Sequence, residues 1–241
     1  MITILIICSL LFFIYVFFYK QSISDYTILQ IHYSQVQKLN ETLLDKAPVI
    51  IKDVEIPHCV QKNSLLSVQR FANTYLGSCK LSEYMNKEVC ELQLSNELEI
   101  FLANETGFNS YIIHNWLPRV YTNPLSQYIS TIESKICFGS HQLQKTSAIW
   151  SLILPIESKY IISLINPNYA ESLPYNWRTI QNLEENLNIQ FIDVIVKPGT
   201  MLILPPHWYY LMKAEENGAY YTFVEYHEPV SILNNYLEKN I

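Results

Sequence analysis

The sequence contains little charge and little glycine. Only 16% of its 241 residues are charged and five are glycine, whereas 49% are hydrophobic and 18 are tyrosine. A disordered protein has the opposite balance, because its chain carries too little apolar surface to bury. No long run of basic residues occurs and the formal net charge is −6, so we expect no nucleic-acid partner. The composition predicts a folded chain with one sizeable domain.

Several motifs of common chemistry are also missing. The sequence has no Cys-x-x-Cys pair, no glycine-rich phosphate loop and no Gly-x-Ser-x-Gly elbow. These absences argue against a structural zinc site of the usual spacing, a nucleotide-binding α/β fold and a serine hydrolase. Four cysteines follow the N-terminal run and could form two disulfides, but we favour buried thiols for them: Cys59, Cys79, Cys90 and Cys137.

The N-terminal segment is the longest apolar run. Residues 2–19 contain no charged side chain, and Lys20 ends the run. As a helix it would reach about 27 Å, close to the hydrocarbon thickness of a bilayer. We expect a transmembrane signal-anchor helix over residues 1–20 and a single-pass membrane protein that contacts the membrane through residues 2–19. The alternative is a cleavable signal peptide, but the run lacks a basic leader and exceeds the usual apolar length.

The rest of the chain divides into two parts. Apolar residues in 21–45 recur at helical spacing, which predicts an amphipathic helical stalk, and residues 46–241 form the main domain. From residue 130 onward, short β-branched or aromatic segments bounded by Pro, Gly or Asn predict strands, with a helical insert over 179–186. This pattern favours a mainly β fold, either an antiparallel sandwich or a double-stranded β-helix barrel with flanking helices. The expected strands are 132–138, 148–154, 160–165, 191–196, 201–204 and 220–226.

The segment 196–214 carries the most specific pattern. Pro198-Gly199 precedes an apolar strand, Pro205-Pro206 follows it, and Trp208-Tyr209-Tyr210 comes next. This order resembles the late strand of the Jumonji-C and cupin-like oxygenase family, which has Pro-Gly-Asp, a strand, a proline and Trp-Trp-His. Residues 47–51 resemble the early strand of that family, and residues 158–167 resemble its Gly-x-Lys, strand and proline. The resemblance covers residues 46–230 and implies a cupin-like, Jumonji-C-like barrel.

In that family, Fe(II) is held by two histidines and one carboxylate beside 2-oxoglutarate. This chain departs from the pattern at every metal position. Tyr210 stands where the second histidine belongs, and the His-x-Asp pair falls on His141-Gln142-Leu143 or on Gln144-Lys145-Thr146. The resemblance therefore implies a degenerate site with no catalytic residue and no metal, in which His141 is the one weak candidate ligand.

The residues that could line a remaining pocket come from three segments. They are His141, Lys159, Trp208 and Tyr210, and the resemblance makes Lys159 a candidate for binding a co-substrate carboxylate. His207 lies an odd number of residues from Tyr210, so in a strand it would point away from the pocket. The same periodicity places Tyr221, Phe223 and Glu225 on one face.

The expected function follows from the missing ligands. We expect a membrane-anchored, Jumonji-C-like pseudoenzyme that binds no iron and acts as a binding or scaffolding module, with a possible protein partner. The first alternative is an active Fe(II)/2-oxoglutarate oxygenase that hydroxylates a protein side chain and uses His141. The second is a cupin that binds a small ligand without metal.

Overall fold

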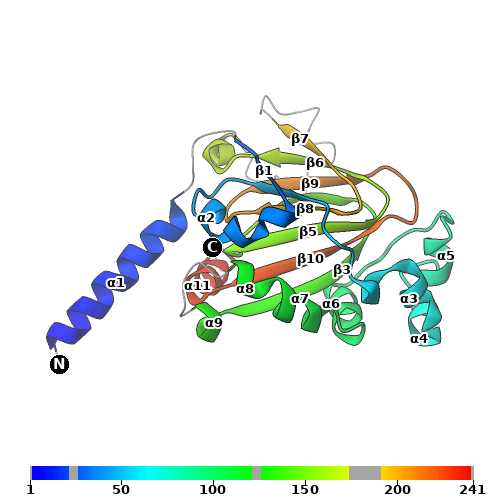
Figure 1. Ribbon diagram of the computed structural model, residues 1–241, viewed down its shortest axis with the longest axis horizontal. Coiled ribbons are helices and arrows are strands. Elements are labelled where there is room, and N and C mark those ends of the chain that lie inside the picture. Colours follow the sequence, from blue (N-terminus) through cyan, green and yellow to red (C-terminus); the bar gives the residue numbers. More distant parts are fainter. Residues whose placement is uncertain (1, 22–26, 121–125, 174–190, 240–241) are drawn as a thin grey trace.

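The protein is built in three layers, with helices on one side of a large sheet and a smaller sheet on the other (Figure 1). The computed structural model describes residues 2–21, 27–120, 126–173 and 191–239. Helix α1 extends away from these layers, and the C-terminal helix α11 lies near its inner end.

The large sheet contains six strands in the order β1-β2-β8-β5-β10-β3. β1 and β2 run parallel and every other neighbouring pair is antiparallel. β10 lies between β3 and β5, and its register places Tyr221 opposite Cys137 and Phe223 opposite Lys135. The strand bounds are β1 Leu29–His32, β2 Val49–Lys52, β3 Thr131–Phe138, β5 Trp150–Glu157, β8 Thr200–Leu204 and β10 Tyr220–His227.

The small sheet contains four antiparallel strands in the order β4-β9-β6-β7. Its strands are β4 His141–Lys145, β6 Tyr160–Ile165, β7 Ile192–Val196 and β9 Tyr209–Ala214. β3 and β4 are the edge strands on one side of the two sheets, and a short turn through Gly139 joins them.

Most helices are short because proline, glycine and β-branched residues interrupt the sequence. Residues 62–72 form two short helices instead of one, since Val68 adopts an extended conformation between them. The α-helices are α1 Ile2–Lys20, α2 Leu39–Leu43, α3 Lys62–Ser67, α4 Gln69–Ala72, α5 Leu81–Met85, α6 Asn96–Glu105, α7 Phe108–Asn115, α8 Leu117–Val120, α9 Ser126–Ile129 and α11 Pro229–Lys239. The 3-10 helices are η1 Tyr33–Lys38, η2 His58–Val60 and η3 Pro167–Ser172.

The two larger hydrophobic cores among the described residues follow from strand alternation, because successive side chains point to opposite faces of a sheet. On β3, Ile136 and Phe138 pack against the helices, whereas Cys137 faces the small sheet. The core between the sheets also contains residues such as Ile153 and Leu202 from the large sheet and Ile162 and Met212 from the small one. Cys137, Trp208 and Tyr210 also belong to this inter-sheet core.

The expectation of a mainly β, closed double-stranded barrel is wrong. The fold is mixed, with more helix than strand, and the two sheets do not close. No hydrogen-bonded strand pair links the sheets in the described part of the chain. Opposite the β3–β4 turn, a groove of about 790 Å³ is lined by residues near β1, β2, β7 and β8, among them Lys52 and Asp193. The prediction of a closed barrel was wrong because strand periodicity shows which faces of a sheet are buried, but not whether its edge strands pair with those of another sheet.

The expectation of a transmembrane signal-anchor helix is also corrected. Among the described residues, none of the helices combines the length and the apolar character needed to span a bilayer. The inner part of α1 is fixed to the domain: the Tyr15 hydroxyl donates to the Glu228 carboxylate, and the Tyr19 hydroxyl donates to the Ser147 carbonyl over 2.6 Å. This leaves residues 2–14, about 20 Å of helix, against a hydrocarbon core of roughly 30 Å.

The segment expected as a helical stalk has a different structure where it is described. Residues 27–45 contain β1, η1 and α2, and Val36, Leu39 and Leu43 are buried in the core beneath the helices. The apolar spacing is therefore satisfied by packing on the domain. The expected helical insert over 179–186 lies outside the described residues.

Candidate metal centre

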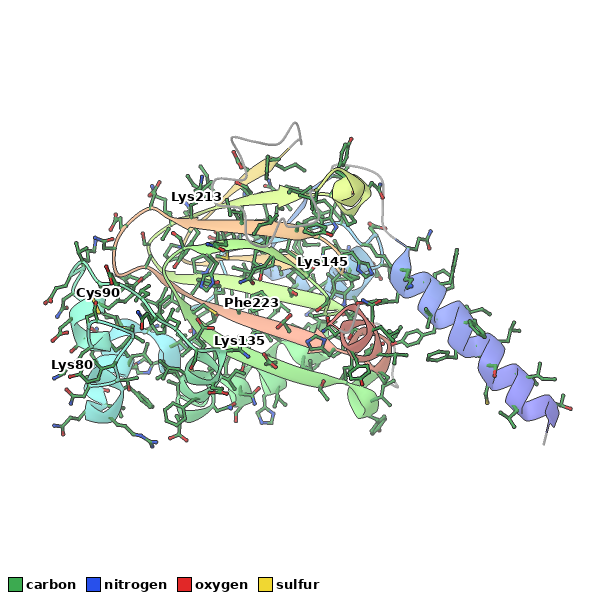
Figure 2. All side chains as sticks on the ribbon, turned by 180° about the vertical axis from the view of Figure 1, so that it is seen from behind. Lys80, Cys90, Lys135, Lys145, Lys213 and Phe223 are labelled. Carbon is green, nitrogen blue, oxygen red and sulfur yellow. A yellow bond between two sulfur atoms is a disulfide. The ribbon has the colours of Figure 1, made fainter. Side chains whose placement is uncertain are left out.

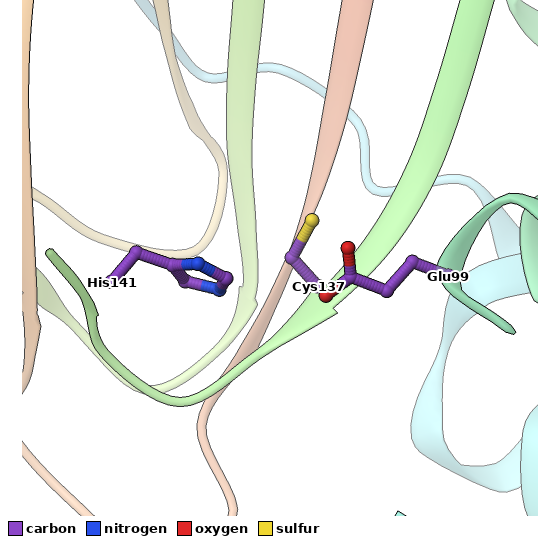
Figure 3. A group of neighbouring side chains, drawn as sticks. All are labelled: Glu99, Cys137 and His141. Atoms are coloured by element: carbon purple, nitrogen blue, oxygen red, sulfur yellow. The ribbon is translucent and has the colours of Figure 1, made fainter. Parts of the chain in front are cut away.

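Three side chains that can ligate a metal meet at the edge of the inter-sheet core. Glu99, Cys137 and His141 each offer one ligating atom, and these atoms lie within 4.8 Å of one another. Figure 3 shows the His141 ring directed toward Cys137, with the Glu99 carboxylate on the other side of the cysteine. The cluster brings together a nitrogen, a sulfur and an oxygen.

Strand β3 and the turn after it position two of the three ligands. Cys137 faces inward because it alternates with Ile136 and Phe138, which face the helices. Gly139 then adopts φ 71°, a left-handed conformation that glycine accepts without strain. The turn carries the chain from the large sheet to the small one, where His141 begins β4. Cys137 and His141 therefore face one another across a change of sheet.

Helix α6 supplies the third ligand. The Ser95 side chain caps its N-terminus by accepting a hydrogen bond from the Leu98 N–H. Glu99, Leu102 and Ala103 are spaced at i, i+3 and i+4, so they share the buried face that packs on β3. Glu99, which lies on this buried face, is only 7% exposed. Such burial costs free energy unless the carboxylate has a partner or is protonated.

The hydrogen bond of His141 leaves one ring nitrogen available. The ring bonds to the Phe138 carbonyl, while Nε2 has no hydrogen-bond partner among the described residues. This arrangement favours the tautomer that carries its proton on Nδ1 and leaves the lone pair on Nε2. Burial lowers the pKa of His141, which favours the neutral form. A neutral imidazole held by a backbone carbonyl is the usual state of a histidine that binds metal.

Cys137 lies between a hydrogen-bond donor and an acceptor. Its thiol donates to the Glu99 carboxylate, and the Tyr221 hydroxyl donates to Sγ. Burial raises the pKa of Cys137 well above its ordinary value, and the Glu99 charge adds to this effect. Burial also raises the pKa of Glu99 to about 7, against the opposing influence of Lys135 and the thiol. Oε1 of Glu99 has no partner among the described residues.

Lys135 is the nearest cation on the same face of β3. Its Nζ lies 2.7 Å from Glu133 and 3.3 Å from Glu225, and 5.7 Å from the centre of the Phe223 ring. Figure 2 shows Lys135 and Phe223 beside one another on β3 and β10. As the sequence predicted, Tyr221, Phe223 and Glu225 share one face of β10. The two glutamates neutralise the charge of Lys135 close to the cluster.

Two of the four expected pocket residues pack in the same core as Cys137. Trp208 and Tyr210 are both buried between the sheets. The Tyr210 hydroxyl donates to Oε1 of Gln144 over 2.7 Å, and its ring lies 6.0 Å from that of Phe223. His141, Trp208 and Tyr210 thus all face the inter-sheet space.

Lys159 lies elsewhere. Its side chain is 53% exposed, and Nζ forms an ion pair with Glu215 at 3.0 Å. His207 also lies away from the cluster: it adopts φ 71° in the turn before β9, and its ring contacts Tyr19 of α1. The structure does not bring either residue to the Glu99–Cys137–His141 cluster.

Sequence reasoning identified His141 and missed the other two ligands. Cys137 was grouped with the buried thiols, and Glu99 was not singled out. Two signals were present in the sequence: the Cys-x-x-x-His spacing around Gly139, and a glutamate at the core position of an amphipathic helix. Two of the other cysteines, Cys79 and Cys90, form a disulfide, while Cys59 is a free thiol.

The donor set matches one metal better than others. Zinc accepts thiolate, imidazole and carboxylate ligands, at bond lengths of roughly 2.0–2.3 Å. Such bonds place tetrahedral ligands about 3.5 Å apart, so ligand atoms that lie within 4.8 Å of one another must move closer when an ion binds. Fe(II) of the 2-oxoglutarate type needs two imidazoles, and a single imidazole belongs to this cluster among the described residues.

Comparisons with known proteins identify no family. No family model matches the chain, and no curated protein matches it. Among solved structures, it is similar to the crystal structure of Peruvianin-I, a cysteine peptidase from Thevetia peruviana latex, with a TM-score of 0.29 and 14% identity. The match covers 46% of this chain and 57% of that chain. A likeness this weak supports no inference about fold or activity.

Proposed function

We propose that this protein is a zinc-binding module, in which one ion held by Glu99, Cys137 and His141 joins the helical layer to both sheets. One observation carries the proposal: three buried ligands of zinc-binding type converge within 4.8 Å. Two of them, Nε2 of His141 and Oε1 of Glu99, have no other partner in the described part of the chain. A buried polar atom without a partner carries a desolvation cost, which a bound ion would offset.

The position of the three ligands supports a cross-linking role for the ion. Glu99 belongs to α6, Cys137 to the edge strand of the large sheet, and His141 to the edge strand of the small sheet. An ion bound to all three cross-links elements that no strand pairing connects. Metal binding at such a site contributes directly to the free energy of folding. A water molecule would complete the tetrahedral set.

This proposal retains the expected binding module and adds a metal to it. The oxygenase alternative requires a second imidazole beside His141, which nothing in the cluster provides. A thiolate ligand favours zinc over the hard cations Mg²⁺ and Ca²⁺. Tyr221 supports the thiolate form by donating to Sγ, as groups around a metal site commonly do.

The direct test is the zinc content of the full-length chain, purified with zinc and then desalted, by inductively coupled plasma mass spectrometry. We expect one zinc per chain, and less than a tenth of that in Cys137→Ser and His141→Ala. Cys59→Ser and His114→Ala are matched controls, because Cys59 is a free thiol elsewhere and His114 is exposed. Equal zinc in all five proteins, or none in any, would refute the proposal.

A thermal-unfolding measurement tests the structural consequence. At a zinc concentration about 100 times Kd, binding to the native state adds about 2.7 kcal/mol to the free energy of unfolding. We expect the midpoint to rise for the original chain and for Cys59→Ser, and to stay constant for His141→Ala. A rise of the same size in His141→Ala would place the zinc elsewhere.

A further inference from the structure

The loop closed by the Cys79–Cys90 disulfide lies beside the turn that joins two of the proposed ligands. The loop contains α5, and it is followed by Leu92, which forms an isolated bridge with Gly77. Two backbone bonds support this bridge: Gln93 N–H donates to the Leu76 carbonyl over 3.0 Å, and Ser78 N–H donates to the Glu91 carbonyl over 3.1 Å. Leu92 therefore depends on the loop for its position.

The β3–β4 turn packs against the loop closed by the Cys79–Cys90 disulfide. Leu92 approaches Gly139 so closely that a Cβ atom on Gly139 would lie 2.8 Å from Cδ1 of Leu92. The Tyr84 hydroxyl, from within the loop, donates to the Ala219 carbonyl over 2.7 Å, and Gly139 N–H donates to the same carbonyl over 2.9 Å. The Tyr84 ring also meets Phe138 edge to face, with centroids 5.8 Å apart. These contacts fix the residues between Cys137 and His141.

The disulfide is reachable from solvent. Cys90 is partly exposed and, together with Tyr84 and Leu92, lines a pocket of about 240 Å³. Gly139 and Ser140, from the β3–β4 turn, form another wall of the same pocket. A small dithiol that reaches Cys90 would therefore act next to the turn. Figure 2 shows Cys90 near one end of the molecule, away from Lys135 on β3.

We propose that the Cys79–Cys90 disulfide controls zinc binding at the Glu99–Cys137–His141 centre, so that reduction of the disulfide releases the ion. This inference rests on the proposed zinc site. In the step, a dithiol reductant attacks the disulfide by thiolate exchange. The S–S bond breaks, Cys79 and Cys90 each gain one electron and one proton, and the reductant becomes a cyclic disulfide.

The consequence for the metal follows from geometry. Without its cross-link, the loop gains conformational freedom, and Leu92 and Tyr84 no longer hold the turn in one position. Cys137 and His141 then sample separations that a single ion does not bridge. Residues that orient metal ligands without touching the ion commonly change affinity by roughly 10–100-fold.

The test compares zinc affinity, by competition with a chromophoric chelator, for four forms of the full-length chain. The first is the oxidised chain, and the second is the chain reduced by a phosphine, which is itself converted to the phosphine oxide. The third is Cys79→Ser/Cys90→Ser, which has no disulfide and adds no thiol ligand. The fourth is Leu92→Ala, which keeps the disulfide but removes the contact with Gly139.

We expect zinc to bind at least about tenfold more weakly to the reduced chain, to the double serine variant and to Leu92→Ala than to the oxidised chain. Cys59→Ser should match the oxidised chain. Equal zinc affinity in the oxidised, reduced and double serine forms would refute redox control without contradicting the proposed zinc site. Absence of zinc binding in all forms would instead refute the zinc site itself. Retained tight binding in Leu92→Ala would refute the mechanical link.

Folding controls keep these outcomes separate. Circular dichroism and a thermal-unfolding midpoint show whether each variant is folded at the temperature of the titration. A folded double serine variant that binds zinc as tightly as the oxidised chain overturns the proposal. If that variant fails to fold, the phosphine-reduced original chain gives the same comparison without a substitution.

Discussion

Cys137 and His141 are separated by only Phe138, Gly139 and Ser140, yet they belong to different sheets and face each other at the edge of the inter-sheet core. The turn between them is the covalent link between the two edge strands. Because Glu99 approaches from α6, all three structural layers meet at this point. Perturbations of the cluster should therefore affect both metal binding and the stability of the whole fold.

The first prediction concerns pH and Glu99. Its folded-state pKa of about 7 lies above its ordinary value of 4.5, so the folded metal-free chain holds a proton that the unfolded chain releases. The free energy of unfolding should therefore fall as pH rises between about 5 and 8, by an amount on the order of 2–3 kcal/mol. Urea denaturation of the metal-free chain at each pH measures this slope.

Glu99→Gln is the matched variant for that measurement. Glutamine cannot ionise, so this variant should lose the contribution of Glu99 and show a flatter stability profile over the same range. An unchanged slope in Glu99→Gln would mean that other groups cause the pH dependence.

The second prediction compares the effects of removing the hydroxyl group from two buried tyrosines. Tyr221 donates to Sγ of Cys137, whereas the hydroxyl of Tyr160 has no partner among the described residues. Tyr221→Phe should weaken zinc binding by roughly tenfold, because the thiolate loses a donor. Tyr160→Phe should leave zinc affinity unchanged and be neutral or slightly stabilising, since it removes an unsatisfied polar group. Chelator competition and chemical denaturation measure the two effects, and a reversed order would contradict the assignment.

The third prediction concerns Lys135. Removing this cation leaves Glu225, which is 17% exposed, without its partner at 3.3 Å. We expect Lys135→Met to cost about 3 kcal/mol of unfolding free energy, as for other buried pairs that lose one member. Glu133 is more exposed, at 39%, so Glu133→Gln should cost at most about 1 kcal/mol.

A double variant provides the control for Lys135. Lys135→Met combined with Glu225→Leu removes both charges and should recover most of the lost stability, measured by the same denaturation. If the double variant is as unstable as Lys135→Met, the loss comes from packing against Phe223 and not from the unpaired charge.

The fourth prediction compares two glycines with positive φ. A Cβ atom on Gly77 would lie 2.4 Å from the Glu91 carbonyl oxygen and 2.6 Å from the Gln93 nitrogen, whereas a Cβ on Gly107 would meet nothing within 4 Å. Gly107→Ala should cost only the backbone strain, about 1–2 kcal/mol. Gly77→Ala should cost clearly more and weaken zinc binding, because it displaces the segment that carries Leu92. Similar losses in both variants would show that the backbone contacts around Gly77 relax easily.

The sequence predicted many of the strands but not their assembly. Alternation and turn residues located the segments that became β3, β6, β7, β8 and β10 to within a few residues. The sequence pattern did not show that β1 joins the large sheet, because the apolar spacing of residues 28–43 fits a helix equally well. Closure of the sheets depends on contacts between edge strands, which no local pattern encodes.

The candidate site was partly visible in the sequence. His141 was recognisable as a possible ligand because the resemblance places the His-x-Asp pair of the oxygenase family on residues 141–143. Glu99 was not, because only the packing of α6 against β3 brings it to Cys137. The apolar run at the N-terminus was misinterpreted for a related reason: Tyr15 and Tyr19 look like part of a uniform apolar helix, but their hydroxyls bond to the domain.

The edge position of β3 has a consequence for the behaviour of the metal-free protein. An edge strand presents unpaired backbone groups that can recruit a strand from another molecule, and natural proteins cover such edges. Here α6 packs beside β3, and Glu99 lies on the face that makes this contact. If the helix detaches when the ligands are lost, the uncovered edge becomes a template for intermolecular β-pairing, and aggregation then competes with refolding.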